Sequence, residues 1–448
     1  MKIRIPVPAV VAISLALLAA SCATAAEPLL SVTSNRPEAL YETGEGVTFA
    51  LRSTAPAGTA INWTLSLDGY RNLATGKGSS GDAASLTVKG SLSEPGFLLL
   101  TATVTGTDGK PFTAYAAAGV SPEKISPSLP VPADFDSFWA KQKETLAAIP
   151  MTVTSEPVPL TAKADAAVEA FDIAVPAETD GPPVTGYFAK PKGAAPKSLP
   201  AVLWVHGAGV RSSSLPAALG GARDGFLSMD INAHGLPNGK PEEFYKQISG
   251  GDLKTYRTDG NKNRDEVYFR GMFVRLQRAL DFLTAQPEWN GKTLAVIGHS
   301  QGGYQALVAG GLDPRVTFIG SGVPAGCDHS GMKADRISGW PKIVALLPDG
   351  EPDPVSLEAC RYVDAVNFAT RCKAEAILSV GFVDRTCPPT SVYAAYNVLT
   401  GPKSIVTRPL MPHASPEDVK TEFRLALLKH AGLHAPPPVT APGTVLTN

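Results

Sequence analysis

The sequence predicts an α/β fold with a mostly parallel sheet, preceded by a small β-sandwich. Residues 28–120 contain short alternating apolar runs divided by turn signals, which is typical of an all-β domain. From about residue 133 onward, short apolar runs alternate with stretches of helical periodicity, as in a sheet covered by helices on both faces. At 294–309 an apolar run leads through a glycine-rich corner into a helix-like stretch.

The composition is that of an ordinary globular protein. Hydrophobic residues make up 44% and charged residues 18% of 448 residues, enough for two or three domains with buried cores. The formal net charge is −1, and the chain has no long basic run and no patch that interleaves basic and aromatic residues. We therefore expect no nucleic-acid partner.

Residues 1–26 have the features of a signal peptide. Lys2 and Arg4 give a positive start, a short apolar run follows, and the small residues 23–25 suit cleavage by signal peptidase. The apolar run is too short to span a bilayer. We expect export to the periplasm or the extracellular space. The alternative is a lipoprotein anchored through an acylated Cys22, the one form of membrane attachment that we expect.

Residues 27–120 are expected to form an immunoglobulin-like β-sandwich. Its default role is that of a spacer or packing domain. Carbohydrate binding is the alternative, with Trp63 and Tyr70 as the aromatic residues to test, although Trp63 sits on an alternating strand as a core residue would. The Pro- and Ser-rich stretch 121–132 is expected to be a linker. The strands are expected at 47–51, 61–67, 86–88, 97–104 and 112–116.

Residues 133–434 are expected to form the α/β domain, and 435–448 a loose tail. A first amphipathic helix opens with Asp134 as its N-cap and runs to about Ala148. An antiparallel pair of strands and then a series of short buried strands follow. The strands are expected at 168–175, 184–189, 201–205, 226–231, 294–297, 316–319, 376–380 and 404–406, and two long helices at 267–286 and 355–370.

The glycine-rich corner spells Gly-x-Ser-x-Gly, with Gly298, Ser300 and Gly302. Between a strand and a helix, this pattern is the nucleophile elbow of α/β-hydrolases, a tight turn that lifts one hydroxyl clear of the sheet. Glycines are needed because the turn leaves little room for Cβ atoms. The less specific interpretation is a glycine-rich loop around a solvated serine. We predict an α/β-hydrolase fold with Ser300 as the nucleophile.

Asp384 and His413 are the predicted partners of Ser300. A serine hydroxyl needs a base to take its proton and a third group to hold that base. In α/β-hydrolases the acid and then the histidine follow the serine along the chain. Asp384 follows the strand expected at 376–380, and His413 follows the last expected strand. Because parallel strands end on the same edge of a sheet, both side chains can converge on the elbow.

The predicted oxyanion hole consists of two backbone amides. One belongs to Gln301, the residue directly after the serine, and the other to Ala208 in the loop 205–209. The alternative interpretation of this loop is a flexible connection with no part in catalysis.

No metal or organic cofactor is expected. The spacings of the cysteines outside the leader do not match a structural zinc site, and Cys327-Asp328-His329 is interpreted as part of a structural loop. An exported protein can oxidise its cysteines, and four of them allow three pairings, between which the sequence does not choose. They are Cys327, Cys360, Cys372 and Cys387.

Several segments of the α/β half carry a family resemblance. They are Pro132 to Trp139, Val267 to Gly271 with Arg278-Ala279-Leu280, Gly298 to Gly303, Tyr362 to Ala369, Gly381 to Pro389, and Ala394 to Asn397 with Gly401-Pro402-Lys403. Through them, roughly residues 130–432 resemble the acetyl xylan esterase and cephalosporin-C deacetylase family. The resemblance implies Ser300 as nucleophile, Asp384 as acid and His413 as base. It also implies removal of acetyl groups from sugars, xylose residues among them.

The sequence departs from the family pattern on the substrate side. Asn232-Ala233-His234-Gly235 stands where the family usually has Arg-Gly-Gln-Gly, and Ala208 stands where it often has an aromatic residue. His413 is followed by Ala414 instead of glutamate, and 236–266 is longer and more polar than the family leads us to expect. His234 is a candidate to approach the substrate, with a structural loop role as the alternative.

The leading prediction is a secreted serine esterase that removes acetyl groups from acetylated oligo- or polysaccharides. The alternatives are another serine hydrolase, such as a longer-acyl esterase or a peptidase, and an inactive scaffold whose sandwich binds glycan. The sequence leaves the oligomeric state open.

Overall fold

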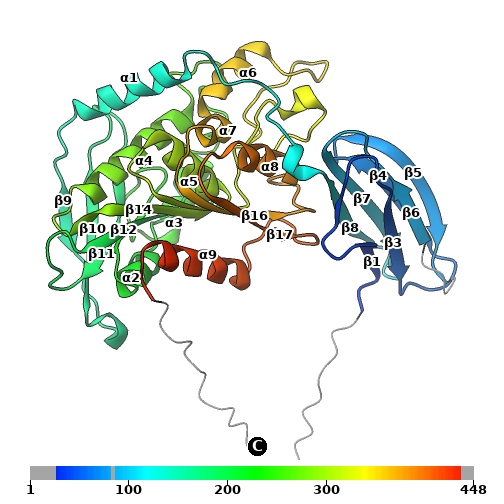
Figure 1. Ribbon diagram of the computed structural model, residues 1–448, viewed down its shortest axis with the longest axis horizontal. Coiled ribbons are helices and arrows are strands. Elements are labelled where there is room, and N and C mark those ends of the chain that lie inside the picture. Colours follow the sequence, from blue (N-terminus) through cyan, green and yellow to red (C-terminus); the bar gives the residue numbers. More distant parts are fainter. Residues whose placement is uncertain (1–26, 82–85, 435–448) are drawn as a thin grey trace, which may run out of the picture.

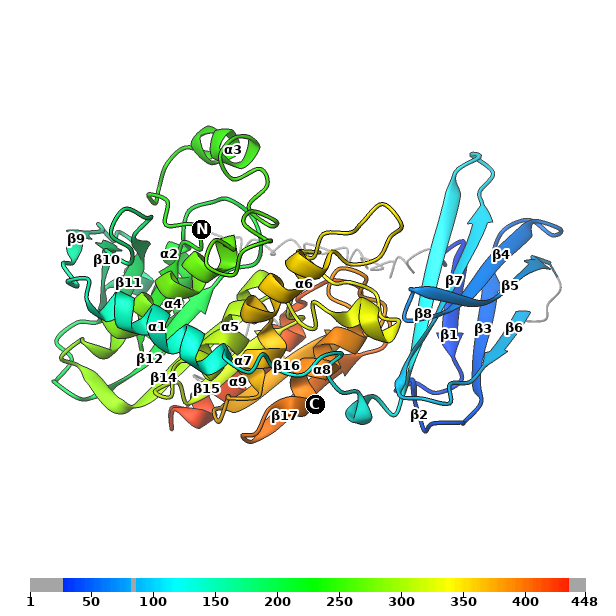
Figure 2. The same cartoon turned by 90° about the horizontal axis from the view of Figure 1, so that it is seen from above.

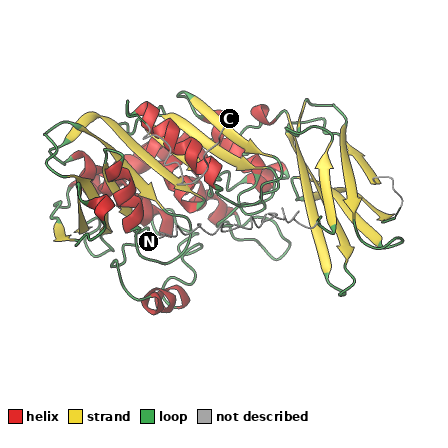
Figure 3. Cartoon of the chain, turned by 90° about the horizontal axis from the view of Figure 1, so that it is seen from below, coloured by secondary structure: helices red, strands yellow, loops and turns green. Residues whose placement is uncertain are grey.

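The computed structural model describes residues 27–81 and 86–434, which form two domains side by side (Figure 1). Residues 1–26, with Cys22, and the tail 435–448 lie outside the described residues. The N-terminal domain consists of strands alone, whereas helices cover the sheet of the larger domain (Figure 3). Within the part of the chain that the structure describes, no helix combines the length and apolar character needed to cross a membrane.

Two sheets form the N-terminal domain, with strand orders β1-β3-β6 and β2-β8-β7-β4-β5. Alternating side chains such as Phe49, Leu65 and Leu100 fill the space between the sheets. The strands are β1 Leu30–Ser34, β2 Leu40–Tyr41, β3 Val47–Ser53, β4 Ala60–Leu67, β5 Arg71–Ser79, β6 Leu86–Gly90, β7 Gly96–Thr105 and β8 Pro111–Val120.

The prediction missed β1, β2 and β5. β5 is an edge strand whose side chains are almost all exposed, so its sequence lacks the apolar alternation of a half-buried strand. Gly76 in this strand faces the ring of Trp63, where a Cβ would lie under 3.0 Å from the ring atoms. Trp63 is therefore partly enclosed by its own sheet. Tyr70 is 50% exposed at the turn between β4 and β5.

The segment 121–132, expected to be a linker, is fastened to the larger domain. It contains a short 3-10 helix at Pro122–Lys124. Asn397 donates hydrogen bonds to the carbonyl oxygens of Pro122 and Ile125, at 2.9 and 2.7 Å. Further along, the N–H of Ser128 donates to the carboxylate of Asp328 at 2.9 Å. These contacts hold the sandwich close to the larger domain.

The larger domain is built on a nine-stranded sheet of order β17-β16-β15-β14-β12-β13-β11-β10-β9. The pairs from β17 to β13 are parallel, and those from β13 to β9 are antiparallel. β9 was not expected, because its four residues are all exposed at the sheet edge. The strands are β9 Thr154–Pro157, β10 Val168–Val175, β11 Val184–Pro191, β12 Leu199–Val205, β13 Leu227–Ile231, β14 Trp289–His299, β15 Phe318–Gly322, β16 Glu375–Gly381 and β17 Lys403–Arg408.

Helices cover both faces of this sheet, which is the arrangement that a parallel sheet with two apolar faces requires. α1, α4, α5, α7 and α8 share one core with the sheet, whereas α9 and α2 pack on the opposite face. The helices are α1 Phe135–Ala147, α2 Leu215–Arg223, α3 Glu242–Gly250, α4 Tyr268–Thr284, α5 Gln301–Leu312, α6 Pro354–Cys360, α7 Ala365–Ala369, α8 Pro389–Val398 and α9 Glu417–His430. In Figure 2, α3 projects from the body of the domain.

The single helix expected at 355–370 was wrong, because the chain is broken there into α6, a 3-10 turn and α7. Asp364 causes the break. Its carboxylate accepts the N–H of Val366 at the start of α7 and the N–H groups of Asp328 and His329 from a neighbouring loop. A carboxylate that takes these three donors is held at a helix N-terminus and cannot continue a helix.

The sequence left the pairing of four cysteines open, and in the described residues none of the four forms a disulfide. Cys327, Cys360, Cys372 and Cys387 are all free thiols, and all four are buried. The described fold is thus held by packing and hydrogen bonding, with none of these sulfurs cross-linked.

Candidate active site

Ser300 lies on a strained turn between β14 and α5. Its φ is 58° and its ψ is −120°, a backbone conformation that residues other than glycine rarely adopt. The turn is close to β12: a Cβ on Gly298 or Gly302 would lie well under 3.0 Å from the carbonyl oxygen of Val205. The N–H of Ser300 donates to Gly322 at 2.8 Å. The sequence therefore specifies this turn through glycines that leave room for the crossing backbone.

His413 connects Ser300 to Asp384. The His413 Nε2 lies 3.0 Å from the Ser300 Oγ, and its Nδ1 lies 2.7 Å from the Asp384 Oδ2. Asp384 follows β16 and His413 follows β17, so adjacent parallel strands deliver both residues to one edge of the sheet. The Asp384 side chain is 0% exposed, whereas that of His413 is 28% exposed. The structure thus brings the three predicted residues together in the order acid, histidine, serine.

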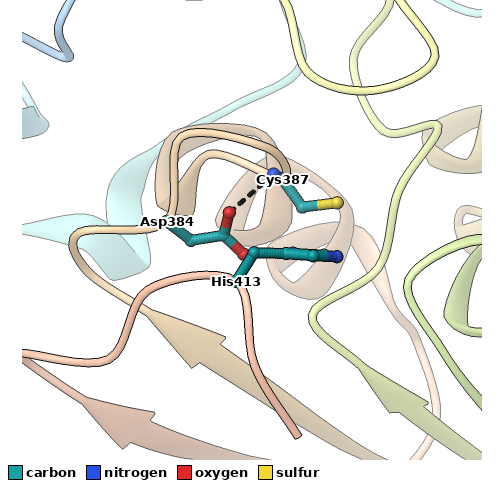
Figure 4. Close-up of side chains that lie close together, drawn as sticks. All are labelled: Asp384, Cys387 and His413. Carbon is teal, nitrogen blue, oxygen red and sulfur yellow. Dashed lines mark hydrogen bonds and ion pairs between the residues drawn. The ribbon is translucent and has the colours of Figure 1, made fainter.

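The second oxygen of Asp384 fixes the carboxylate in place. Oδ1 accepts the N–H groups of Thr386 and Cys387 at 2.8 and 2.9 Å, so the loop after β16 wraps around its own acid. Figure 4 shows the carboxylate between this loop and the ring of His413. An imidazole held by a fixed carboxylate can take the proton of the serine hydroxyl and carry the resulting positive charge.

Asp384, Cys387 and His413 offer ligand atoms that all lie within 4.8 Å of one another (Figure 4). Both oxygens of Asp384 and the Nδ1 of His413 are already engaged in the hydrogen bonds described above. Burial raises the pKa of the Cys387 thiol well above its ordinary value, so the sulfur stays protonated near neutral pH. Hydrogen bonds therefore already occupy these atoms of Asp384 and His413, and a cation would have to displace them.

Both segments of the predicted oxyanion hole lie beside Ser300. Gln301 is the first residue of α5, so its N–H has no acceptor within the helix. The loop of Ala208 also reaches the serine: a Cβ on Gly207 would lie 3.7 Å from the Ser300 Cβ. Ala208 itself is exposed. The use of these two amides as donors remains a prediction.

An aromatic cluster that the sequence did not reveal stands next to this elbow. Tyr256 donates a hydrogen bond to the side-chain oxygen of Gln301 at 2.9 Å. Its ring packs against His234 and Tyr268, with centroids 4.8 and 5.3 Å away, and against Trp340 at 6.5 Å. Tyr256 and Trp340 belong to irregular segments, so no periodicity or motif in the sequence predicts their position in this cluster. Only their shared aromatic character could have suggested a site.

His234, a candidate to approach substrate, is enclosed by this cluster. It is 2% exposed, and its Nδ1 lies 2.7 Å from the Tyr268 hydroxyl. Burial is the largest cause that lowers its pKa to about 3. The ring is therefore neutral near pH 7, and the structure favours the structural alternative. His299 is likewise unsuited to act as base, since its ring stacks on Phe423 of α9.

A helix-covered, mainly parallel sheet with a strained serine at a strand-to-helix turn places the protein among the α/β-hydrolases. Comparison with known proteins narrows this class. The family model "Acetyl xylan esterase (AXE1)" matches residues 123–430, which is more than half of the chain. The chain belongs to the acetyl xylan esterase family and is a carboxylic ester hydrolase.

Individual relatives agree with this assignment. The chain is 32% identical over 388 residues to the acetyl esterase Axe7A of Xylanibacter ruminicola, covering 85% of each chain. This likeness reaches beyond the residues that the family model matches. Among solved structures, an acetyl xylan esterase from Paenibacillus sp. R4 is similar with a TM-score of 0.58 and 26% identity, covering 69% of this chain and 98% of that chain. Acetyl xylan esterase 1 from Thermoanaerobacterium sp. JW/SL YS485 shares the fold at a TM-score of 0.56 and 22% identity, covering 69% and 97%.

Proposed function

We propose that the protein is a serine esterase that removes acetyl groups from acetylated oligo- or polysaccharides of the xylan type, using Ser300, His413 and Asp384. The observation that carries this proposal is the continuous chain of hydrogen bonds from the Ser300 hydroxyl through both nitrogens of His413 to Asp384. The family and the printed names of its relatives supply the acetyl and xylan part of the proposal.

The first half of the reaction forms an acyl-enzyme. The Ser300 Oγ attacks the acetyl carbonyl carbon while its proton passes to the His413 Nε2. The resulting oxyanion is stabilised by the amides of Gln301 and Ala208. His413 then returns the proton to the sugar oxygen, the ester C–O bond breaks, and the deacetylated sugar leaves.

The second half releases acetate. His413 takes a proton from water, whose oxygen attacks the acetyl-serine carbonyl, and then gives that proton back to the Ser300 Oγ as the acyl bond breaks. The Asp384 carboxylate stabilises the imidazolium in both halves. The buried position of Asp384 and its two bonds from Thr386 and Cys387 hold the carboxylate in the orientation that this task requires.

Replacement of Ser300 by alanine tests the proposal directly. We expect Ser300→Ala to lower hydrolysis of p-nitrophenyl acetate and acetylated xylooligosaccharides at least about a thousandfold, and to abolish labelling by a fluorophosphonate probe. Asp384→Asn and His413→Ala should also lose most activity, whereas the exposed His434→Ala serves as control. Full activity in Ser300→Ala would contradict the nucleophile, and a preference for longer acyl chains or amides would contradict acetyl specificity.

We also propose that the protein is exported, on the strength of the sequence of residues 1–26. N-terminal sequencing of the mature protein tests this proposal. Loss of the leader supports export, a mature chain beginning at an acylated Cys22 supports the lipoprotein form, and a retained leader contradicts both.

A further inference from the structure

One carboxylate of the sandwich is buried where the sandwich meets the larger domain. Asp68 lies at the turn between β4 and β5 and is only 6% exposed. Its N–H donates to Phe97 of β7 at 2.7 Å, which fixes the turn on the sandwich. One carboxylate oxygen accepts the N–H of Ile337 at 2.9 Å, and the other accepts the hydroxyl of Thr390. Removing a carboxylate from water costs free energy even when it accepts two hydrogen bonds. Such a group between domains is not expected of a simple spacer.

Both partners of Asp68 belong to segments that border the active site. Thr390 is the second residue of α8, the helix that begins directly after the loop carrying Asp384. Ile337 lies in the loop that continues to Trp340, and the N–H of Trp340 donates to the carbonyl oxygen of Thr386 at 2.7 Å. Thr386 is one of the two residues whose N–H groups hold Asp384. Asp68 therefore connects two segments that lead to Asp384, the loop of Ile337 and the N-terminal end of α8.

Aromatic rings of the sandwich contact the same part of the larger domain. The ring of Phe97 packs edge-on against Phe382, two residues before Asp384, with centroids 5.1 Å apart. The same ring also lies 5.8 Å from Tyr393 of α8. Arg385, the residue after the acid, places its guanidinium 5.9 Å from the ring of Tyr115 on β8. The sandwich thus contacts the loop of Asp384, called the acid loop, at Phe382 and Arg385, and it contacts the helix α8 that follows this loop.

We propose that the sandwich is a positioning part of the catalytic centre, in which Asp68 and Phe97 hold the loop that orients Asp384. This inference rests on the proposed function of Asp384. Its physical basis is that the acid acts only through its alignment with His413, and small displacements of catalytic groups lower rates steeply. In the free larger domain, Phe382 and Thr390 would lose these partners, so the acid loop would gain freedom.

The test compares variants that remove hydrogen bonds between the two domains with one that removes a hydrogen bond within the sandwich. Asp68→Ala removes both hydrogen bonds, and Thr390→Val removes one while nearly keeping the side-chain shape. Ser66→Ala is the matched control, because Ser66 is a buried residue of β4 whose hydroxyl donates to the carbonyl oxygen of Leu99 in the same domain. Each variant is measured in the full chain for kcat and KM on p-nitrophenyl acetate, for the rate of fluorophosphonate labelling, and for its melting temperature.

We expect Asp68→Ala to lower kcat and the labelling rate about tenfold, with KM nearly unchanged. Thr390→Val should show a smaller loss of the same kind, and Ser66→Ala should match the wild type. In Asp68→Ala/Thr390→Val the loss should be smaller than the product of the single losses, since the two substitutions break the same hydrogen bond between Asp68 and Thr390. The milder Asp68→Asn, which keeps one acceptor oxygen, provides a folded comparison if Asp68→Ala melts below the assay temperature.

Folded Asp68 variants with wild-type kcat and labelling rate would overturn the proposal, as would independent losses in the double variant. A wild-type chain that neither hydrolyses acetyl esters nor reacts with the probe would instead overturn the proposed function, so the two failures are distinguishable.

Discussion

At the residue scale, the positions that define the elbow follow from local chemistry. Gly298 and Gly302 leave room for the carbonyl oxygen of Val205, and Ser300 adopts a positive φ between them. Such requirements are visible in the sequence because few residue types satisfy them. The convergence of Asp384 and His413 on Ser300 was also predictable, since parallel strands end at one edge of the sheet.

Two glycine substitutions should have opposite effects on stability. In Gly302→Ala the new Cβ would collide with backbone of the Val205 and His206 region, so we expect a loss of more than about 2 kcal/mol in the free energy of unfolding and a loss of probe labelling. Gly220, inside α2, has nothing within 4 Å of an added Cβ, and Gly220→Ala should stabilise by about 0.5–1 kcal/mol. Urea unfolding measures both. Equal stabilities would contradict the packing argument.

At the scale of elements, the regular strands and helices were more predictable than the connections between them. The long helix α4 begins and ends within two residues of its expected bounds, because its apolar periodicity is strong. Tyr256, Trp340 and Asp68 lie in turns and irregular loops, where contacts depend on how distant segments pack. Their roles could not be deduced from spacing, and the substrate side of the site was therefore largely hidden in the sequence.

The segment between α3 and α4 holds the side chain of Gln301, a predicted oxyanion-hole residue, through one hydroxyl. Tyr256→Phe removes the hydrogen bond to Gln301 while keeping the ring among His234, Tyr268 and Trp340. We expect kcat for acetyl esters to fall about five- to tenfold with a small change in KM, because the lost bond is worth about 1 kcal/mol.

Tyr245→Phe is the control for this variant. Tyr245 is a buried tyrosine of α3 whose hydroxyl donates to Pro237, away from the elbow. Equal kcat values in the two variants would show that the Tyr256 hydroxyl does not act through Gln301.

At the scale of the whole molecule, buried titratable groups make the folding stability depend on pH in opposite directions. Burial lowers the pKa of His329 to about 3 and that of His299 to about 4, so each ring is kept neutral in the fold. Their contribution to stability is complete above the unfolded pKa near 6.5 and is lost as pH falls. Burial raises the pKa of Asp68 and Asp230 to about 7, and their contribution is instead lost as pH rises through that value.

His329→Gln isolates one of these effects. Between pH 7.5 and 5 the unfolded wild-type chain takes up a proton at His329 that the folded chain does not, which should cost the wild type about 2 kcal/mol of stability. The variant lacks this cost, so its free energy of unfolding should fall less on acidification. Chemical denaturation at the two pH values measures the difference. Parallel losses in both proteins would show that His329 is protonated in the fold.

The reactivity of the four buried thiols can report how often the structure around each of them opens. A thiol reagent can reach Cys327, Cys360, Cys372 or Cys387 only after the surrounding structure separates, because all four are free and enclosed. Cys387 lies beside the acid and Cys372 lies between α7 and β16, so sulfurs that react one by one report local fluctuations of different regions. Sulfurs that react together report complete unfolding, and when the modification is faster than refolding their common rate measures the lifetime of the folded molecule.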